Sequence, residues 1–194
     1  MSQRRSAQET RTLLFEAASR ILRAGGLNHL TLAAVAREAG LSKGGLLYHF
    51  PTKEALIEAL FEYHNDLFES RLAELAAAQA DRPGAWLRAY ARASIEQITD
   101  PETASLYSSL FAAEERYATA HRLMRQKYAR WQTQVDDCGL EPDWASLIRL
   151  TVDGLWFSEM HHYAPLPPAR REQIVALIEQ LTQDPHYIRG NHVP

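Results

Sequence analysis

A short segment near the N-terminus carries the side chains best suited to contact a nucleic acid. Residues 42–53 read SKGGLLYHFPTK, which gathers two lysines, a tyrosine and a histidine. Ammonium groups attract phosphate, and tyrosine and histidine can hydrogen-bond to phosphate oxygens or base edges. Helical spacing would turn Lys43, Tyr48 and His49 outward, which suits a helix in the DNA major groove. The alternative for the lysines is an ordinary surface role.

Two short helices joined by a tight turn are needed to present this segment. The apolar residues of 32–39 recur at i, i+3, i+4 and i+7, which is one face of a helix. Thr31 can cap the start of that helix, and Gly40 supplies the left-handed residue that ends it. Ser42 can cap a second helix two residues later, with Leu46 facing inward. The pattern predicts a helix-turn-helix.

The other candidate DNA contacts follow from their positions in this unit. Thr31 and Thr52 lie at helix starts, where hydroxyls and free backbone N–H groups can meet phosphate oxygens. Gly44 and Gly45 keep the front of the second helix thin. Leu47 is equally suited to a thymine methyl contact or to a half-buried place in the core. The predicted DNA-contacting residues are Thr31, Ser42, Lys43, Gly44, Gly45, Leu47, Tyr48, His49, Thr52 and Lys53.

The run TLAAVAREAGLSKGGLLYHFPTKEAL resembles the DNA-binding signature of TetR-type (tetracycline-repressor-like) transcriptional regulators. The resemblance covers about residues 8–68, and the rest of the chain is similar only in length and helical pattern. It implies a regulator, most often a repressor, that binds a palindromic operator as a dimer. Many members carry Ser or Thr where this chain has Gly45, so the sequence preference stays open. The resemblance implies contacts at Thr31, Lys43, Gly44, Tyr48, His49 and Lys53.

Composition and charge agree with a cytoplasmic regulator. Residues 1–53 hold eight Lys or Arg against three acidic residues, whereas residues 54–194 hold thirteen against twenty-one. A basic unit on an acidic body is expected when one end meets phosphate. The sequence has no apolar run long enough for a membrane span and no signal-peptide core. Its one cysteine, Cys138, excludes an intrachain disulfide, as expected in a reducing compartment.

Helical patterns follow one another along the chain, and no segment predicts a strand. Breaks at glycine and proline divide the sequence into about nine helices, which predicts an all-α fold. In the long fourth helix Leu67 is expected on the inner side, and Asp143 is expected to cap the eighth helix. The predicted domains are a helix-turn-helix DNA-binding domain at residues 1–51, a helical effector-binding and dimerisation domain at 52–184, and a polar tail at 185–194.

Aromatic side chains gather in the fifth to eighth helices. Core packing is the simpler interpretation of any one of them. As a group they suit a small-molecule pocket, since Tyr and Trp combine apolar rings with polar tips. The resemblance implies an effector pocket between these helices, so a mostly apolar, aromatic-type effector is expected. The predicted effector-contacting residues are Trp86, Tyr90, Tyr107, Phe111, Glu114, Tyr128, Trp131, Trp156 and His161.

The eighth and ninth helices are candidates for contact with a second chain. Apolar residues surround the eighth helix on more than one side, which also suits a central core helix. Gly154 in its middle costs about 1 kcal/mol relative to Ala, a cost that a close approach of another helix would offset. The resemblance implies a homodimer with a four-helix bundle. The predicted interface residues are Leu147, Gly154, Ile174, Leu177, Ile178 and Leu181.

Motifs for metal or covalent chemistry are weak. His161 and His162 are adjacent, so on a helix they point about 100° apart and do not readily chelate one metal. No metal, cofactor or membrane partner is predicted, and no local arrangement predicts an enzyme. The function expected is a DNA-binding transcriptional regulator that responds to a ligand. The alternatives are a constitutive DNA-binding protein without an effector and an enzyme with a helical active-site domain.

Overall fold

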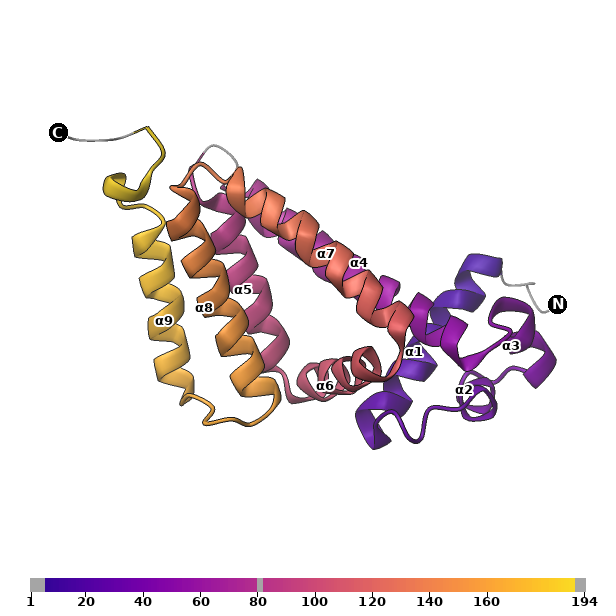
Figure 1. Cartoon of the computed structure of the whole chain (residues 1–194). Helices are drawn as coiled ribbons and strands as arrows, with labels where there is room; N and C mark the ends of the chain where they lie inside the picture. Colours follow the sequence, from indigo (N-terminus) through magenta and orange to yellow (C-terminus); the bar gives the residue numbers. More distant parts are fainter. Residues whose placement is uncertain (1–5, 80–81, 191–194) are drawn as a thin grey trace. The chain divides into compact units, whose positions relative to one another are not determined.

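The structure is a computed structural model that describes residues 6–79 and 82–190 (Figure 1). Within these ranges the regular elements are nine α-helices and one short 3₁₀ segment. A single isolated β-bridge pairs Leu140 with Ile188. The predicted all-α class and helix count are therefore confirmed for this part of the chain. The helices are α1 (Ala7–Gly25), α2 (Leu32–Glu38), α3 (Lys43–His49), α4 (Lys53–Ala77), α5 (Ala85–Thr99), α6 (Pro101–Arg116), α7 (Ala118–Asp136), α8 (Pro142–Met160) and α9 (Pro168–Leu181).

The first helices begin where their side chains can cap them. Ser6 and Glu9 form a reciprocal capping box at α1. The Thr31 hydroxyl accepts a hydrogen bond from the third amide of α2, and the Ser42 hydroxyl does the same in α3. Gly40 adopts φ +66°, which favours glycine and ends α2. The predicted signals at Thr31, Gly40 and Ser42 are confirmed.

The start of α8 differs from the sequence prediction. The helix begins at Pro142, and Glu141 precedes it without capping it through its side chain. Asp143 therefore lies inside the first turn and is not the cap. Proline is well suited to the first helical position because its missing N–H would have no partner there. The Asp143 carboxylate still lies at the positive end of the helix dipole.

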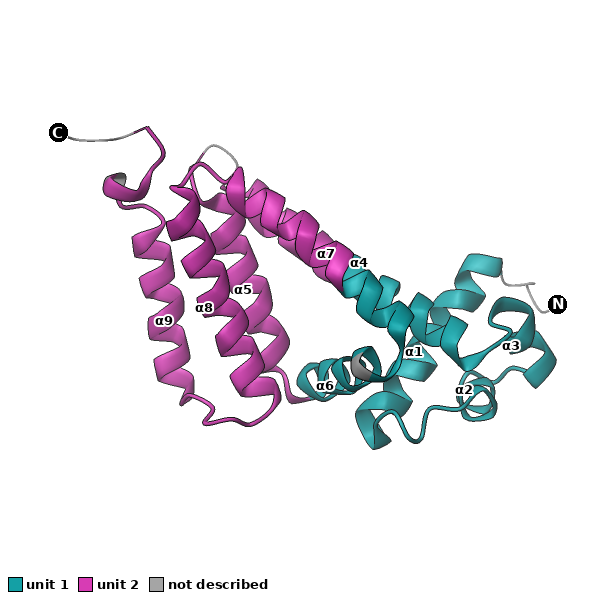
Figure 2. Ribbon diagram, in the orientation of Figure 1, with its two compact units in different colours: residues 1–66, 102–124 teal, residues 67–101, 125–194 magenta. Residues whose placement is uncertain are grey.

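The chain forms two compact units (Figure 2). Unit 1 comprises residues 1–66 and 102–124, and unit 2 comprises residues 67–101 and 125–194. Helices α4 and α7 each begin in unit 1 and end in unit 2. Unit 1 thus includes α6, which packs with the N-terminal helices although it follows them by half the chain. The predicted boundary after residue 51 separates a DNA-binding domain from an effector-binding and dimerisation domain. It is a division by function and stays a prediction.

Unit 1 is built around apolar side chains that α1 to α4 and α6 contribute. Phe15 stacks on Tyr63 with ring centroids 4.8 Å apart, and the Arg11 guanidinium lies 4.8 Å from the ring centroid of Phe50. Burying each large apolar side chain contributes about 1.5–3 kcal/mol. This core fixes α2 and α3 on α1. Its fully buried members include Leu14, Leu22, Leu30, Val35, Leu46 and Leu56.

Hydroxyl groups connect α1 to α4 and α6 inside unit 1. Ser19 Oγ lies 2.8 Å from His64 Nε2, and both residues are buried. From α6, Ser105 and Ser109 donate to carbonyl oxygens in the last turn of α1, each at 3.1 Å. The Leu22 carbonyl also accepts from the Gly26 amide at 2.9 Å, so Ser109 adds a second partner there, while Ser105 gives a partner to the Arg23 carbonyl at the helix end. Burial lowers the pKa of His64 to about 4, with the Arg23 charge adding to the shift.

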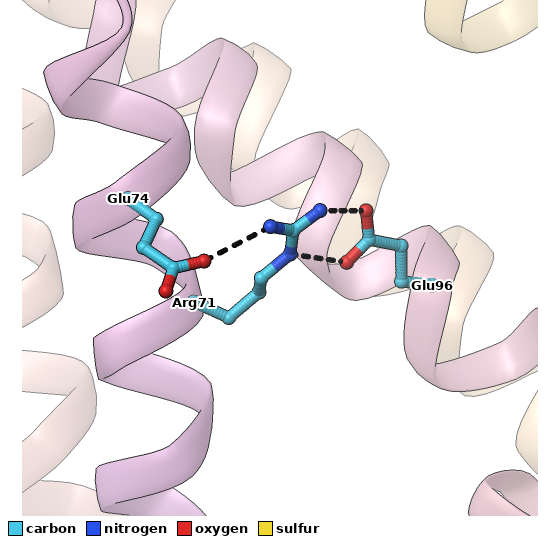
Figure 3. Close-up of polar contacts among 3 residues, drawn as sticks. All are labelled: Arg71, Glu74 and Glu96. Atoms are coloured by element: carbon cyan, nitrogen blue, oxygen red, sulfur yellow. Dashed lines mark hydrogen bonds and ion pairs between the residues drawn. The ribbon is translucent and has the colours of Figure 1, made fainter.

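Unit 2 packs α5, α8 and α9 with the second halves of α4 and α7. Its fully buried apolar residues include Leu87, Val135, Leu140 and Ala145. On its surface, Arg71 of α4 donates two parallel hydrogen bonds of 2.8 Å to Glu96 of α5 and one of 3.0 Å to Glu74 (Figure 3). The paired geometry fixes the spacing of α4 and α5 better than a single contact would. Leu67, expected on the inner side of α4, is 49% exposed instead.

The described part of the predicted polar tail packs against unit 2. Pro185–Tyr187 form the 3₁₀ segment, and the Tyr187 ring stacks on Trp144 with centroids 4.0 Å apart. The Arg189 amide donates to the Gly139 carbonyl at 3.0 Å. This ring stacking and this backbone hydrogen bond thus hold part of the predicted polar tail against unit 2. Residues 191–194 of the predicted tail lie outside the described part. No helix in the described ranges combines the length and apolar content needed to cross a bilayer.

Candidate nucleic-acid interface and effector groove

Helix α3 presents its polar side chains to solvent and its apolar ones to the core. Tyr48 is 84% exposed, Lys43 is exposed and His49 is half-buried. The His49 ring meets the Tyr48 ring edge-on at 5.2 Å, which supports the tyrosine in its outward position. On the opposite side, Leu46 and Phe50 are buried at 0% and 2% exposure. The helix is therefore anchored by one face and leaves the other free for a partner.

The two glycines of α3 differ in the space around them. A Cβ placed on Gly44 would meet no other atom within 4 Å, so the helix front is open there. A Cβ on Gly45 would lie 3.3 Å from the Ser42 hydroxyl, which is engaged in capping the helix. A side chain at Gly45 would crowd the cap, whereas Gly44 leaves the backbone accessible to an approaching surface.

Three hydroxyls predicted to contact DNA lie at helix starts. Those of Thr31, Ser42 and Thr52 each accept a backbone N–H hydrogen bond at 3.0–3.1 Å, and all three residues are exposed. A hydroxyl that accepts one bond keeps its own hydrogen, which it can donate to a phosphate oxygen. The capping geometry and the predicted phosphate contacts are thus compatible.

Lys53 is held within the chain more firmly than Lys43. Its Nζ donates to the carbonyl oxygen of Leu27 at 3.2 Å, and the side chain is half-buried. Burial lowers the pKa of Lys53, and the nearby Arg116 charge lowers it further. Lys53 therefore ties the start of α4 to the segment after α1, and its predicted phosphate contact remains a prediction. Leu47 is 36% exposed, which leaves both of its alternatives open.

In unit 2 the structure gathers predicted effector contacts from α5 and α7. Trp131 packs against Tyr128 and Tyr90 with centroid distances of 5.0 and 5.7 Å, and against Phe68 of α4 at 5.4 Å. Trp86 stacks on Tyr90 at 5.2 Å. The packing of α5 and α7 therefore creates one aromatic cluster, which consists of Trp86, Tyr90, Tyr128 and Trp131.

A polar group that the sequence analysis missed lies beside this cluster. Asp153 of α8 accepts hydrogen bonds at 2.5 Å from the Tyr90 hydroxyl and from Arg149 Nη1. The Arg149 guanidinium carbon lies 6.0 Å from the Tyr128 ring centroid. Burial raises the pKa of Asp153 and of Tyr90. An Arg–Asp pair four residues apart on an otherwise apolar helix was the available sequence signal.

A surface groove of about 390 Å³ borders the aromatic cluster. Beside it, Lys127 Nζ donates to Glu69 at 2.9 Å, so that carboxylate is already paired. A second groove of about 300 Å³ shares Trp86 with the first and extends to Cys138, whose thiol pKa is raised by burial. The first groove is lined by Glu69, Leu72, Trp86, Arg130, Trp131, Thr133 and Gln134.

The other predicted effector residues have separate surroundings. Trp156 donates to Gln97 at 3.0 Å, and His161 lies against Phe157 at the end of α8 with centroids 4.3 Å apart. Tyr107, Phe111 and Glu114 belong to α6 and to unit 1. The Tyr107 hydroxyl donates to the His64 carbonyl at 3.5 Å, and Glu114 pairs with His121 at 3.0 Å. Their effector contacts remain predictions.

Helices α8 and α9 carry large apolar side chains on their exposed surface. Leu147, Leu150, Phe157 and Leu177 are 43–56% exposed, and a Cβ on Gly154 would meet nothing within 4 Å. Leu147, Gly154 and Leu177, three of the residues predicted for the dimer interface, lie on this exposed surface, and the interface itself stays a prediction. Ile174 and Leu181 are partly buried. Ile178 was predicted for the same interface, but it is 4% exposed in the core of unit 2 and is not available to a partner.

The described residues contain no cluster of side chains that could bind a metal ion. No three His, Cys, Asp or Glu side chains of residues 6–79 and 82–190 gather closely enough to hold an ion. The cluster around Asp153 consists instead of tyrosine, arginine and one carboxylate, which suits hydrogen bonding to an organic molecule.

Comparison with known proteins adds the family context. The family model described as "Bacterial regulatory proteins, tetR family" matches residues 14–60, and the model described as "Tetracyclin repressor-like, C-terminal domain" matches residues 84–183. The HTH-type transcriptional regulator TtgR of Pseudomonas putida is 40% identical over 65 residues, 31% of each protein. The chain thus matches about a third of the length of that relative.

Solved structures show the same fold over nearly the whole chain. A crystal structure titled as a putative transcriptional regulator from Pseudomonas aeruginosa PAO1 superposes with a TM-score of 0.72 at 20% identity, covering 92% of this chain and 90% of that one. The multidrug binding protein EbrR complexed with ethidium has a TM-score of 0.68 at 23% identity, covering 91% and 99%. At these identities the likeness concerns the fold.

Proposed function

The chain belongs to the TetR family of bacterial regulatory proteins, and from that premise we propose that it is a cytoplasmic repressor that binds a palindromic operator as a dimer and releases it on binding a small molecule. The observation that carries the proposal is α3, whose Lys43 and Tyr48 face solvent while Leu46 and Phe50 anchor it. A short helix held in this way can enter the major groove as a rigid unit. Its exposed groups then meet phosphates and base edges.

Dimer formation is supported by the apolar surface of α8 and α9. Four large apolar side chains half-exposed on two neighbouring helices, beside the open Gly154, are costly to leave in water. A second copy applied by a two-fold axis would bury the same patch on both chains. Two α3 helices would then read two half-sites of a palindrome.

Effector response is supported by the aromatic cluster and the groove beside it. The structural neighbour EbrR is described as a multidrug binding protein in complexes with malachite green and ethidium. In this chain Trp86 and Trp131 border a groove of about 390 Å³, within the size range of small-molecule sites. A ligand that prefers one conformation of the body would shift operator affinity by its differential affinity for the two states.

Selection of DNA fragments from a random library by the purified protein tests this function. We expect enrichment of one palindromic sequence, a complex of two chains per palindrome, and weaker binding at higher salt because phosphate contacts release counterions. Enrichment without any palindromic preference would contradict the repressor. Binding that no compound changes would favour the alternative of a constitutive DNA-binding protein.

A further inference from the structure

Two buried N–H groups beside Tyr128 have no hydrogen-bond partner among the described residues. One is Nε1 of Trp131, a residue only 7% exposed, and the other is Nε of Arg149, whose side chain is 16% exposed. Both side chains border the Tyr128 ring, at 5.0 Å between ring centroids for Trp131 and 6.0 Å from the guanidinium carbon for Arg149. A buried donor without an acceptor costs about 1–3 kcal/mol, so two of them in one cluster need an explanation.

The one carboxylate of this cluster already accepts a hydrogen bond at each of its oxygens. Asp153 uses one carboxylate oxygen for the Tyr90 hydroxyl and the other for Arg149 Nη1. What the cluster offers to a further molecule is therefore hydrogen-bond donation. A ligand with acceptor oxygens satisfies it, whereas a cation would add donors or an unpaired positive charge.

The charges around the groove point to the same chemistry. Glu69 and Arg130 line the groove, Lys127 pairs with Glu69, and Arg149 pairs with Asp153 beside Tyr128. Arg130 Nη2 also lies 4.0 Å from the Glu69 carboxylate. Together these three cations and two carboxylates leave one positive charge in excess. This local balance is opposite to that of residues 54–194 as a whole, where acidic residues outnumber Lys and Arg. A monoanion would neutralise the excess.

The groove walls select the shape of the ligand. Trp86 and Trp131 line it, and Leu72 provides an apolar contact. Flat aromatic walls favour a planar ring that can stack or pack edge-on. Because Trp131 Nε1 is closed off from solvent, a ligand can reach it only when the indole side chain turns.

We propose that the effector is a planar aromatic carboxylate whose ring packs on Trp86 and Trp131 and whose carboxylate oxygens accept hydrogen bonds from the Trp131 indole and the Arg149 guanidinium. This inference rests on the proposed function of the body as an effector-binding domain. A carboxylate effector would differ in charge from the ligands of EbrR, which is described in complexes with the cationic dyes malachite green and ethidium.

Titration calorimetry with three compounds on the full chain tests the ligand class. Naphthalene-2-carboxylate is the anion, naphthalene-2-carboxamide is its neutral counterpart, and tetraphenylphosphonium is a bulky aromatic cation. We expect the carboxylate to bind most tightly, the amide more weakly and the cation least. The carboxylate should also change tryptophan fluorescence, because Trp131 must turn, and should weaken the complex with the selected DNA.

Trp131→Phe keeps a ring at the site and removes only the indole donor. We expect about tenfold weaker carboxylate binding, which is the size expected for one lost buried hydrogen bond. Trp144→Phe is the matched control, because Trp144 Nε1 is also buried without a partner but its ring stacks on Tyr187. Arg130→Gln, at an exposed position, should weaken the anion several-fold without affecting folding.

The outcomes separate this inference from the proposed function. If tetraphenylphosphonium binds as tightly as the carboxylate and releases DNA, the ligand class is wrong and the ligand-responsive repressor stands. Equal carboxylate affinity in Trp131→Phe and the wild type overturns the assigned donor. Failure of all three compounds to bind overturns the inference. Failure of the chain to bind any selected DNA contradicts the proposed function, whatever the calorimetry shows.

Discussion

The exposed face of α3 and the polar cluster around Asp153 place their polar groups in opposite environments, the first in water and the second in the protein interior. On α3, Lys43 and Tyr48 stand in water, where an unpaired polar group costs little until a partner arrives. Around Asp153, polar groups from α5 and α8 are buried and must be paired where they are. A surface for DNA can thus be carried by one short helix, whereas a site inside the body requires several helices to meet.

The same contrast applies to the cost of an unpaired group. Tyr48, at 84% exposure, leaves its hydroxyl in water at little cost, whereas an N–H group buried without an acceptor, as at Trp131 and Arg149, costs free energy. A ligand that accepts hydrogen bonds from both groups would remove that cost. Unit 2 is therefore the region in which ligand binding and folding stability are coupled.

Leu177→Glu should have the largest effect, because it places a charge in the proposed dimer contact. Leu177 is half-exposed and lies in the proposed contact. Burying a carboxylate without a partner costs several kcal/mol, so a glutamate at this position should prevent two chains from associating. Light scattering should report monomers or aggregates in place of dimers. Leu67→Glu is the matched control, since Leu67 is equally exposed but lies on α4. A wild-type monomer at micromolar concentration would contradict the interface.

His64 should make unit 1 sensitive to acid. Its pKa in the folded chain is about 4, below the ordinary 6.5, so the unfolded chain takes up the proton first. Stability is complete above pH 6.5 and falls as the pH drops towards 4, by up to about 3 kcal/mol. Urea unfolding between pH 7 and 4 should show a flatter profile for His64→Gln than for the wild type. The exposed His186→Gln is the control, and parallel profiles for all three proteins would contradict the assignment.

Tyr48→Ala and Lys43→Ala should weaken operator binding while helix content and dimer mass stay unchanged. A lost specific contact of about 1–3 kcal/mol reduces affinity about 5- to 150-fold. Lys43→Ala should also lower the slope of log K against log salt by about 0.9, if one phosphate contact is lost. Mobility shifts at several salt concentrations measure both effects. Arg170→Ala, an exposed charge at the start of α9, should change neither, and unaltered binding in both α3 variants would refute the interface.

Glu96→Gln should have the smallest effect, because its pair with Arg71 is exposed (Figure 3). The hydrogen bonds from Arg71 lower the pKa of Glu96, so the contribution to stability is present above its ordinary value and disappears as the pH falls through the lowered one. We expect a melting temperature lower by no more than about 2 °C at pH 7 and no difference in strong acid. Glu62→Gln on the exposed face of α4 is the control. A loss that persists unchanged in acid would show that the charge pair is not its cause.

The sequence by itself determined the elements that depend on neighbours within one helical turn. Thr31 and Ser42 cap helices as predicted because each hydroxyl reaches an amide only three residues ahead, and Ser6 caps α1 by the same local contact. Gly40 ends α2 because no other residue adopts positive φ so readily. The outward set on α3 follows from helical periodicity alone. These local rules were enough to predict the all-α class and the DNA-binding segment.

Only the tertiary structure decided which faces of the later helices are covered. Leu67 and Ile178 are both apolar and helical, yet the first is exposed and the second is buried, because the neighbouring helices cover only one of them. Asp153 finds the Tyr90 hydroxyl 63 residues away, a distance along the chain at which no periodicity applies. The docking of Tyr187 on Trp144 is likewise a contact between distant segments. Such pairings depend on the packing of whole helices, and therefore the buried cluster became visible only in three dimensions.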